Sequence, residues 1–216
     1  MLNIHHQKGV SLISLMIGVS LSMLAILTML KIFETLRLTS SEAQAVAALN
    51  TSQSSSLLTA EMLLANSSYG IATPTYLVQS NMVLNTNVAE ATATIVAATP
   101  TAPDASRANV ILWSEQDILD ATKTRCVGLI SPTQTGGLAT ITKSDCASPT
   151  TTGIWSYAWL NETTSRTQPW YLTFALVPSV ACSPFGLEEN PGIHSVLSIG
   201  VLNNATPLSK ICLINT

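Results

Sequence analysis

The sequence predicts an α+β fold, in which a long N-terminal helix with a membrane-spanning first half packs on a mainly antiparallel β-sheet. Three observations predict it. Residues 10–30 form an uncharged, mostly apolar run. No proline occurs before Pro74, so one helix can continue from this run past residue 64. After residue 75, short segments rich in β-branched and aromatic residues alternate with Pro, Gly and Asn, as is typical of strands joined by turns.

The apolar run is long enough to cross a bilayer. As a helix, residues 10–30 would extend about 32 Å at roughly 1.5 Å per residue, and a hydrocarbon core is about 30 Å thick. A short polar leader, residues 1–9, precedes the run and carries Lys8, and no acidic residue occurs before Glu34. The positive-inside bias therefore places the leader in the cytoplasm.

Two general interpretations of this run are a secretory signal and a plain membrane anchor. A secretory signal fits poorly, because such signals have apolar regions of about 7–15 residues with cleavage soon after. The nearest Ala-x-Ala pattern, residues 43–45, is separated from the run by Lys31, Glu34, Arg37 and Glu42. A plain transmembrane anchor is adequate to explain the length of the run and its lack of charge.

A third interpretation explains the residues around the start of the run. Lys8-Gly9 followed by Val-Ser-Leu-Ile-x-Leu-Met resembles the cleavage and methylation site of type IV prepilins. The resemblance implies that a membrane peptidase cuts after Gly9 and methylates the new N-terminus at Val10. It also implies that the residues following the cut pack in a filament core: Ser11, Leu12, Ile13, Ser14, Leu15, Met16 and Gly18.

The chain departs from the family pattern at Ser14, the fifth residue of the mature chain, where the family usually has Glu. A carboxylate in an apolar bundle is costly unless it is paired, and in the family it is matched to the N-terminal amine of a neighbouring subunit. A subunit that joins the filament first has no earlier neighbour whose N-terminal amine needs to be neutralised. Ser14 therefore favours a tip or priming position over an abundant shaft position; the alternative is tolerated drift in a minor subunit.

The composition indicates an exported protein that packs against other subunits. The 216 residues allow one domain plus an extended helix, or at most two domains. Hydrophobic residues make up 47% and charged residues only 10%, against roughly 25% charged in typical soluble domains. Without Lys8, 8 basic and 12 acidic side chains remain, a formal balance of −4. Nucleic-acid binding through bulk charge is therefore disfavoured.

The four cysteines lie outside the membrane on this topology, and an even number in an oxidising compartment predicts two disulfides. Three connectivities are open, and locality alone favours Cys126–Cys146 and Cys182–Cys212. A zinc site is a poor alternative, because no cysteine pair has Cys-x2–4-Cys spacing and His194 is the only histidine after the leader.

Beyond the membrane-spanning segment, residues 10–32, apolar residues continue at helical spacing, so residues 33–70 are expected to carry the helix into the globular domain. Its end is expected within residues 67–70, where Gly70 can adopt the left-handed conformation of a helix cap. The segment Leu-Leu-x-x-Ser-x-Tyr-Gly-Ile, ending at Ile71, resembles the corresponding segment of the PilW family of minor pilins.

Residues 71–216 are expected to form a β-rich head of the pilin type. Its Trp and Tyr residues at 155, 157 and 159 are expected in the core, residues 99–104 in an exposed loop, and residues 117–123 in a helical turn or longer. The expected strands are Tyr76–Gln79, Ala93–Ala98, Asn109–Trp113, Cys126–Ile130, Leu138–Thr142, Ile154–Leu160, Tyr171–Val177, Val196–Leu202 and Ile211–Ile214.

The sequence offers little for catalysis. A nucleophilic triad would depend on His194, which lies in a Pro-Gly-Ile-His segment that reads as a turn. Asp117 and Asp120, or the segment 188–190, could hold a cation only weakly. No enzyme activity, cofactor or metal is expected.

The resulting expectation is a minor pilin of a type IV pilus, made in the bacterial inner membrane and incorporated at or near the filament tip. The family resemblance implies other minor and major pilins, the prepilin peptidase, the inner-membrane assembly platform with its ATPase, and a large tip adhesin as partners. Two alternatives stay open. One is a type II secretion pseudopilin, whose tip subunits also lack the Glu; the other is an uncleaved, membrane-anchored adhesin or receptor domain.

Overall fold

A single α-helix, α1 (Leu12–Ala65), forms the N-terminal part of the protein in a computed structural model that describes residues 12–97, 108–161, 170–183 and 192–213. The chain divides into two compact units, Met1–Thr51 and Ser52–Thr216. Most of α1 belongs to the first unit, and its last turns, residues 52–65, belong to the second unit, which we call the head. The expected leader, residues 1–9, and the expected loop, residues 99–104, lie outside the described residues.

The helix ends at Ala65, slightly before the expected segment 67–70. Residues 66–70 form turns instead, in which Ser68 (φ 57°) and Gly70 (φ 75°) both adopt the left-handed conformation. The turn is tied to the sheet because the amide of Gln116 donates to the carbonyl of Tyr69 at 3.0 Å. A Cβ at Gly70 would collide with the Gln116 side chain, so this position needs glycine for space as well as for its conformation.

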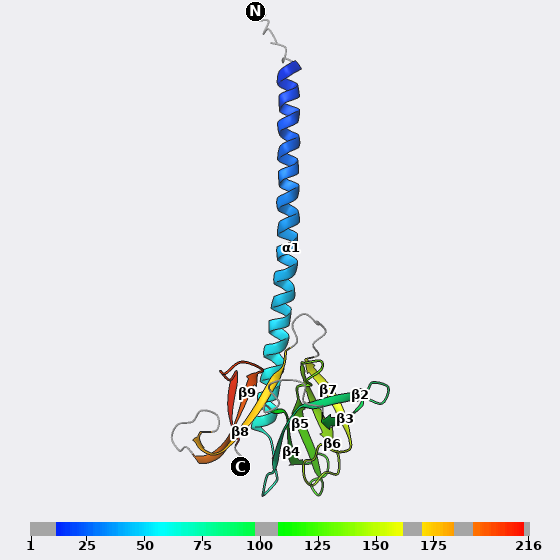
Figure 1. The fold of residues 1–216 in the computed structure, drawn as a ribbon, viewed down its shortest axis with the longest axis vertical. Coiled ribbons are helices and arrows are strands. Elements are labelled where there is room, and N and C mark those ends of the chain that lie inside the picture. The colour runs from blue at the N-terminus through cyan, green and yellow to red at the C-terminus, as the bar shows by residue number, and fades with distance from the viewer. Residues whose placement is uncertain (1–11, 98–107, 162–169, 184–191, 214–216) are drawn as a thin grey trace, which may run out of the picture. The chain divides into compact units, whose positions relative to one another are not determined.

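The head contains a ten-stranded sheet in which every named strand pairing is antiparallel. The order is β10-β9-β8-β4-β5-β6-β7-β3-β2, and β1 pairs with β4 (Figure 1). The strands are β1 (Tyr76–Ser80), β2 (Met82–Asn87), β3 (Thr92–Ala97), β4 (Ala108–Gln116), β5 (Thr124–Ile130), β6 (Leu138–Lys143), β7 (Ile154–Asn161), β8 (Leu172–Cys182), β9 (Gly192–Val201) and β10 (Ser209–Leu213).

Strand β4 is buried on both faces and separates two cores. Alternate side chains of a strand point to opposite faces, so Ile111 and Trp113 enter one core while Val110 and Leu112 enter the other. A strand buried in this way has a continuous apolar run rather than an alternating pattern, as residues 110–113 of β4 have.

The first core is where the end of α1 packs on the sheet. Ala60 and Leu64 of α1 are fully buried there against residues of β4, β5, β8, β9 and β10. Figure 1 shows these last turns of α1 beside β8 and β9. The expected α+β architecture, a long N-terminal helix packed on an antiparallel sheet, is therefore confirmed.

The second core lies inside the curl formed by β4, β5, β6, β7, β3 and β2, each of which contributes a buried side chain. The largest is Trp155, which is fully buried, as the sequence predicted for this aromatic segment. The side chain of Asn109 closes the curl: its Oδ1 accepts from the amide of Met82 at 2.9 Å, and its Nδ2 donates to the Met82 carbonyl at 2.7 Å.

Two local predictions for the head were wrong, and one strand was not predicted. Residues 117–123 form a loop between β4 and β5, not a helical turn. The carboxylates of Asp117 and Asp120 accept from backbone amides two residues later, a local alternative to helical hydrogen bonding. Gly192, Ile193 and His194, expected within a turn, instead begin strand β9 (Gly192–Val201). Strand β2 was not expected, because Asn85 and Asn87 in its second half are of a type depleted in strands.

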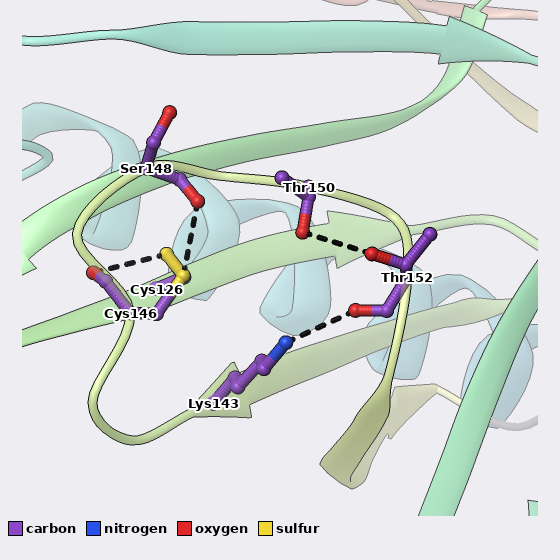
Figure 2. Close-up of a disulfide and its surroundings, with 6 residues drawn as sticks. All are labelled: Cys126, Lys143, Cys146, Ser148, Thr150 and Thr152. Carbon is purple, nitrogen blue, oxygen red and sulfur yellow. Dashed lines mark hydrogen bonds between the residues drawn. A yellow bond between two sulfur atoms is a disulfide. The ribbon is translucent and has the colours of Figure 1, made fainter.

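Two disulfides, Cys126–Cys146 and Cys182–Cys212, join the cysteines as locality favoured. Figure 2 shows the first, which ties β5 to the loop after β6. Its sulfurs lie 3.2–3.4 Å from the carbonyl oxygens of Cys146 and Ser148. These are sulfur–oxygen contacts, because a disulfide sulfur carries no proton. The same loop is held by Lys143, whose Nζ donates to the carbonyl of Thr152 at 3.0 Å (Figure 2).

Candidate functional site

The first unit presents apolar side chains on every side of α1. Residues 12–30 carry no charge, and their large apolar side chains are 56–74% exposed. A helix that is apolar all round is typical of a membrane span or of the interior of a large assembly. The segment extends about 28 Å at roughly 1.5 Å per residue. By length and composition it can cross a membrane, which is compatible with membrane anchoring.

Three hydroxyl groups within this apolar segment are satisfied inside the helix. Ser20, Ser22 and Thr28 each donate to a backbone carbonyl three or four residues earlier, at 2.9, 2.8 and 2.8 Å. A hydroxyl that is hydrogen-bonded in this way loses little when it leaves water. These residues therefore do not oppose burial of the segment in lipid or against other helices.

The predicted packing residues that the structure describes all lie in α1. Leu12, Ile13, Leu15 and Met16 are 63–74% exposed. Ser14 and Gly18 are one helical turn apart and therefore lie on the same side, with Ser22 one turn further. A Cβ at Gly18 would meet nothing within 4 Å. The predicted cleavage and methylation residues Gly9 and Val10, and the packing residue Ser11, lie outside the described residues.

Charged residues begin directly after the apolar segment. Lys31 and Glu34 form an ion pair at 3.3 Å with both side chains largely exposed, and such pairs contribute little to stability. Arg37 and Glu42 follow on the same helix. The change from an uncharged to a charged helix surface marks the end of the segment suited to lipid.

The other predicted site residues do not gather into one site. Among the described residues, no three His, Cys, Asp or Glu side chains lie close enough to hold a metal ion. His194 is half-buried on β9 opposite Val180, and its Nδ1 has no hydrogen-bond partner. The candidate cation segment 188–190 lies outside the described residues.

One feature of the head, a hollow beside α1, was not predicted from the sequence. A hollow of about 510 Å³ lies between the last turns of α1 and the β4–β5 loop, with Met62, Tyr69 and Ile118 in its wall. Met62 lies on an exposed side of α1, away from the buried Ala60 and Leu64, and Tyr69 and Ile118 lie outside the helix. Leu58 and Met62, four residues apart on the other side of the helix, were the available signal.

Comparison of the chain with protein-family models, curated proteins and solved structures gave no significant match.

Proposed function

We propose that the protein is a minor pilin of a type IV pilus, a structural subunit that primes assembly and sits at or near the filament tip. The observation that carries the proposal is the prepilin-type segment Lys8 to Met16, which runs into the start of an apolar helix that leads into a disulfide-bonded β-rich head. A plain anchor would explain the apolar helix but not the residues at its start.

The mechanism is assembly rather than catalysis. After cleavage behind Gly9, the apolar part of α1 holds the subunit in the inner membrane, and later packs among the helices of other subunits. This step exchanges lipid contact for helix contact, which depends on close packing rather than on the hydrophobic effect. Ser14, Gly18 and Ser22 support it, because small residues at four-residue spacing on one side of α1 allow another helix to approach closely.

Ser14 supports the tip position. A Glu at this point would need a neighbouring amine as its partner in the apolar core, and a serine needs none. The proposed partners are other minor and major pilins, the prepilin peptidase, the inner-membrane assembly platform with its ATPase, and a large tip adhesin. The proposed location is the inner membrane for the precursor and the extracellular pilus tip for the mature chain.

The proposal is tested by following the chain into filaments sheared from the cell surface. We expect the mature chain in the sheared fraction, at a small ratio to the main subunit. Gly9→Val removes it from this fraction by blocking cleavage, whereas Asn3→Val, a matched change within the leader, leaves it there.

Two results would favour the other candidate functions. A cleaved chain confined to the cell envelope would indicate a type II secretion pseudopilin. An uncleaved chain in the membrane would indicate an anchored adhesin or receptor domain.

A further inference from the structure

The last turns of α1 are apolar on the side that faces away from the core as well as on the side that faces it. Ser56, Ala60 and Leu64 are buried in the head, while Leu58 and Met62 on the other side are 57% and 53% exposed. A helix on a protein surface normally carries polar residues on its outer side. Two large apolar residues one turn apart are therefore an exception that needs an explanation.

Three further exposed apolar side chains continue this surface. Tyr69 follows the helix and is 71% exposed, and Ile118 and Leu119 in the β4–β5 loop are 81% and 96% exposed. Met62, Tyr69 and Ile118 share the wall of the hollow of about 510 Å³. We call the five residues Leu58, Met62, Tyr69, Ile118 and Leu119 the head patch.

Hydrogen bonds hold the loop residues of the head patch in place. The Oδ1 of Asp117 accepts from the amide of Leu119 at 2.9 Å. The Nε2 of Gln116 donates to the carbonyl of Ala121 at 2.5 Å, and its backbone amide donates to the carbonyl of Tyr69 at 3.0 Å. The loop is thus fixed to itself and to the turn after α1. A surface that is already ordered loses less entropy when a partner binds.

The surroundings of the head patch are acidic. Four carboxylates lie next to or near its residues in the chain, which we call its border: Glu61 beside Met62 in α1, and Glu115, Asp117 and Asp120 on both sides of Ile118 and Leu119, against two cations, Lys123 and Arg125. Both cations are engaged: Arg125 pairs with Glu115 at 2.5 Å, and Lys123 with Asp120 at 3.8 Å. Glu61 and Asp117 form no ion pair within the part of the chain that the structure describes. The border therefore has an excess of two negative charges.

This charge distinguishes between possible occupants. A second copy of the chain would place the same acidic border against itself, and the whole chain is acidic as well, with a net charge of −3. An anionic lipid surface would be repelled in the same way. A different protein with an apolar ridge flanked by Lys or Arg would match both the apolar centre and the acidic border.

We propose that the head patch is the docking site for a different protein, which presents an apolar ridge bordered by basic side chains. This inference does not depend on the function proposed above, since it rests on the surface of the head alone. It applies equally to a filament subunit and to an anchored domain.

The test uses the full chain in the membrane of its own cells, with a photo-reactive amino acid at position 119. The control places the same probe at Val88, which is 81% exposed in the β2–β3 turn and lies outside the head patch. We expect a discrete adduct with one other protein at 119 and not at 88. Because Leu119 is 96% exposed, the probe should not disturb folding, and an unchanged melting temperature would verify this.

Charge reversal then tests the acidic border. Glu61→Lys is expected to reduce the adduct at 119 about tenfold, whereas Glu90→Lys, an exposed change in the β2–β3 turn, should leave it within about twofold; a tenfold change is an ordinary effect for one residue of an interface. An adduct of two copies of this chain, an adduct with lipid, equal adducts at both positions, or no adduct at 119 would overturn the proposal. So would an adduct that Glu61→Lys does not weaken.

Discussion

At the scale of single residues, the buried side chain of Asn109 connects β4 to the start of β2. Its side chain makes three hydrogen bonds in a buried position: one from the Met82 amide, one to the Met82 carbonyl and one to the Ser131 carbonyl at 2.8 Å. The side chain therefore takes the place of a strand next to the first residue of β2. It joins the two ends of the curl that surrounds the second core.

Replacing Asn109 with leucine should destabilise the head. The change keeps the approximate size of the side chain but removes the partners of one amide and two carbonyl groups, and each buried group left unpaired costs about 1–3 kcal/mol. We expect the free energy of unfolding in urea to fall by about 2–4 kcal/mol. Asn85→Ala, at an exposed position of β2, should change it by less than about 0.5 kcal/mol. Equal unfolding curves for the two variants would show that Asn109 does not close the curl.

At the scale of elements, the two disulfides differ in solvent exposure and in the strands that they connect. Cys126 and Cys146 are 0% and 6% exposed and are part of the second core. Cys182 and Cys212 are half-buried and connect β8 to β10 across β9. A reductant can therefore reach the second bridge in the folded protein, whereas the first is shielded.

Brief reduction of the folded protein followed by alkylation should distinguish the bridges. We expect peptide mass spectrometry to find label at Cys182 and Cys212 well before Cys126 and Cys146, and label at all four once urea is added. Earlier label at Cys126 would contradict the buried position of that bridge. Removing the Cys126–Cys146 bridge with the double substitution Cys126→Ala and Cys146→Ala should lower the free energy of unfolding by up to about 3 kcal/mol in the chain-entropy model.

The apolar part of α1 carries a prediction about the proposed tip position. Ser14→Glu introduces the residue that is usual in the family, but a first subunit has no neighbouring amine to pair with it. A carboxylate without a partner in an apolar environment costs about 2.5–3.5 kcal/mol on insertion scales. We therefore expect much less of this variant in sheared filaments, and an unchanged amount for Ser14→Ala. Increased incorporation of Ser14→Glu would argue for a shaft position instead.

At the scale of the whole molecule, the long-range pattern of the sequence predicted the architecture well. The absence of proline before Pro74 and the apolar spacing predicted one helix leading into the head, and α1 is continuous to Ala65. Runs of β-branched and aromatic residues predicted nine of the ten strands, because such runs fit a pleated and largely buried surface.

What the sequence could not predict depends on contacts between distant residues. Strand β2 contains Asn85 and Asn87, a residue type depleted in strands, and is held by Asn109, which lies 27 residues from Met82. The strand at His194 depends on pairing with β8, which outweighs the turn tendency of Gly192. The head patch was missed because apolar residues are normally assigned to a core. Helical spacing alone puts Leu58 and Met62 on the other side of α1 from Ala60 and Leu64, but only the folded structure adds the exposed Tyr69, Ile118 and Leu119.

The mature N-terminus of the protein decides whether the chain is processed as a filament subunit. We would isolate the protein from its own membrane and determine that N-terminus by mass spectrometry. We expect a chain that begins at N-methylated Val10. A chain that begins at Met1, in cells with an active prepilin peptidase, would contradict this expectation and leave a membrane-anchored domain.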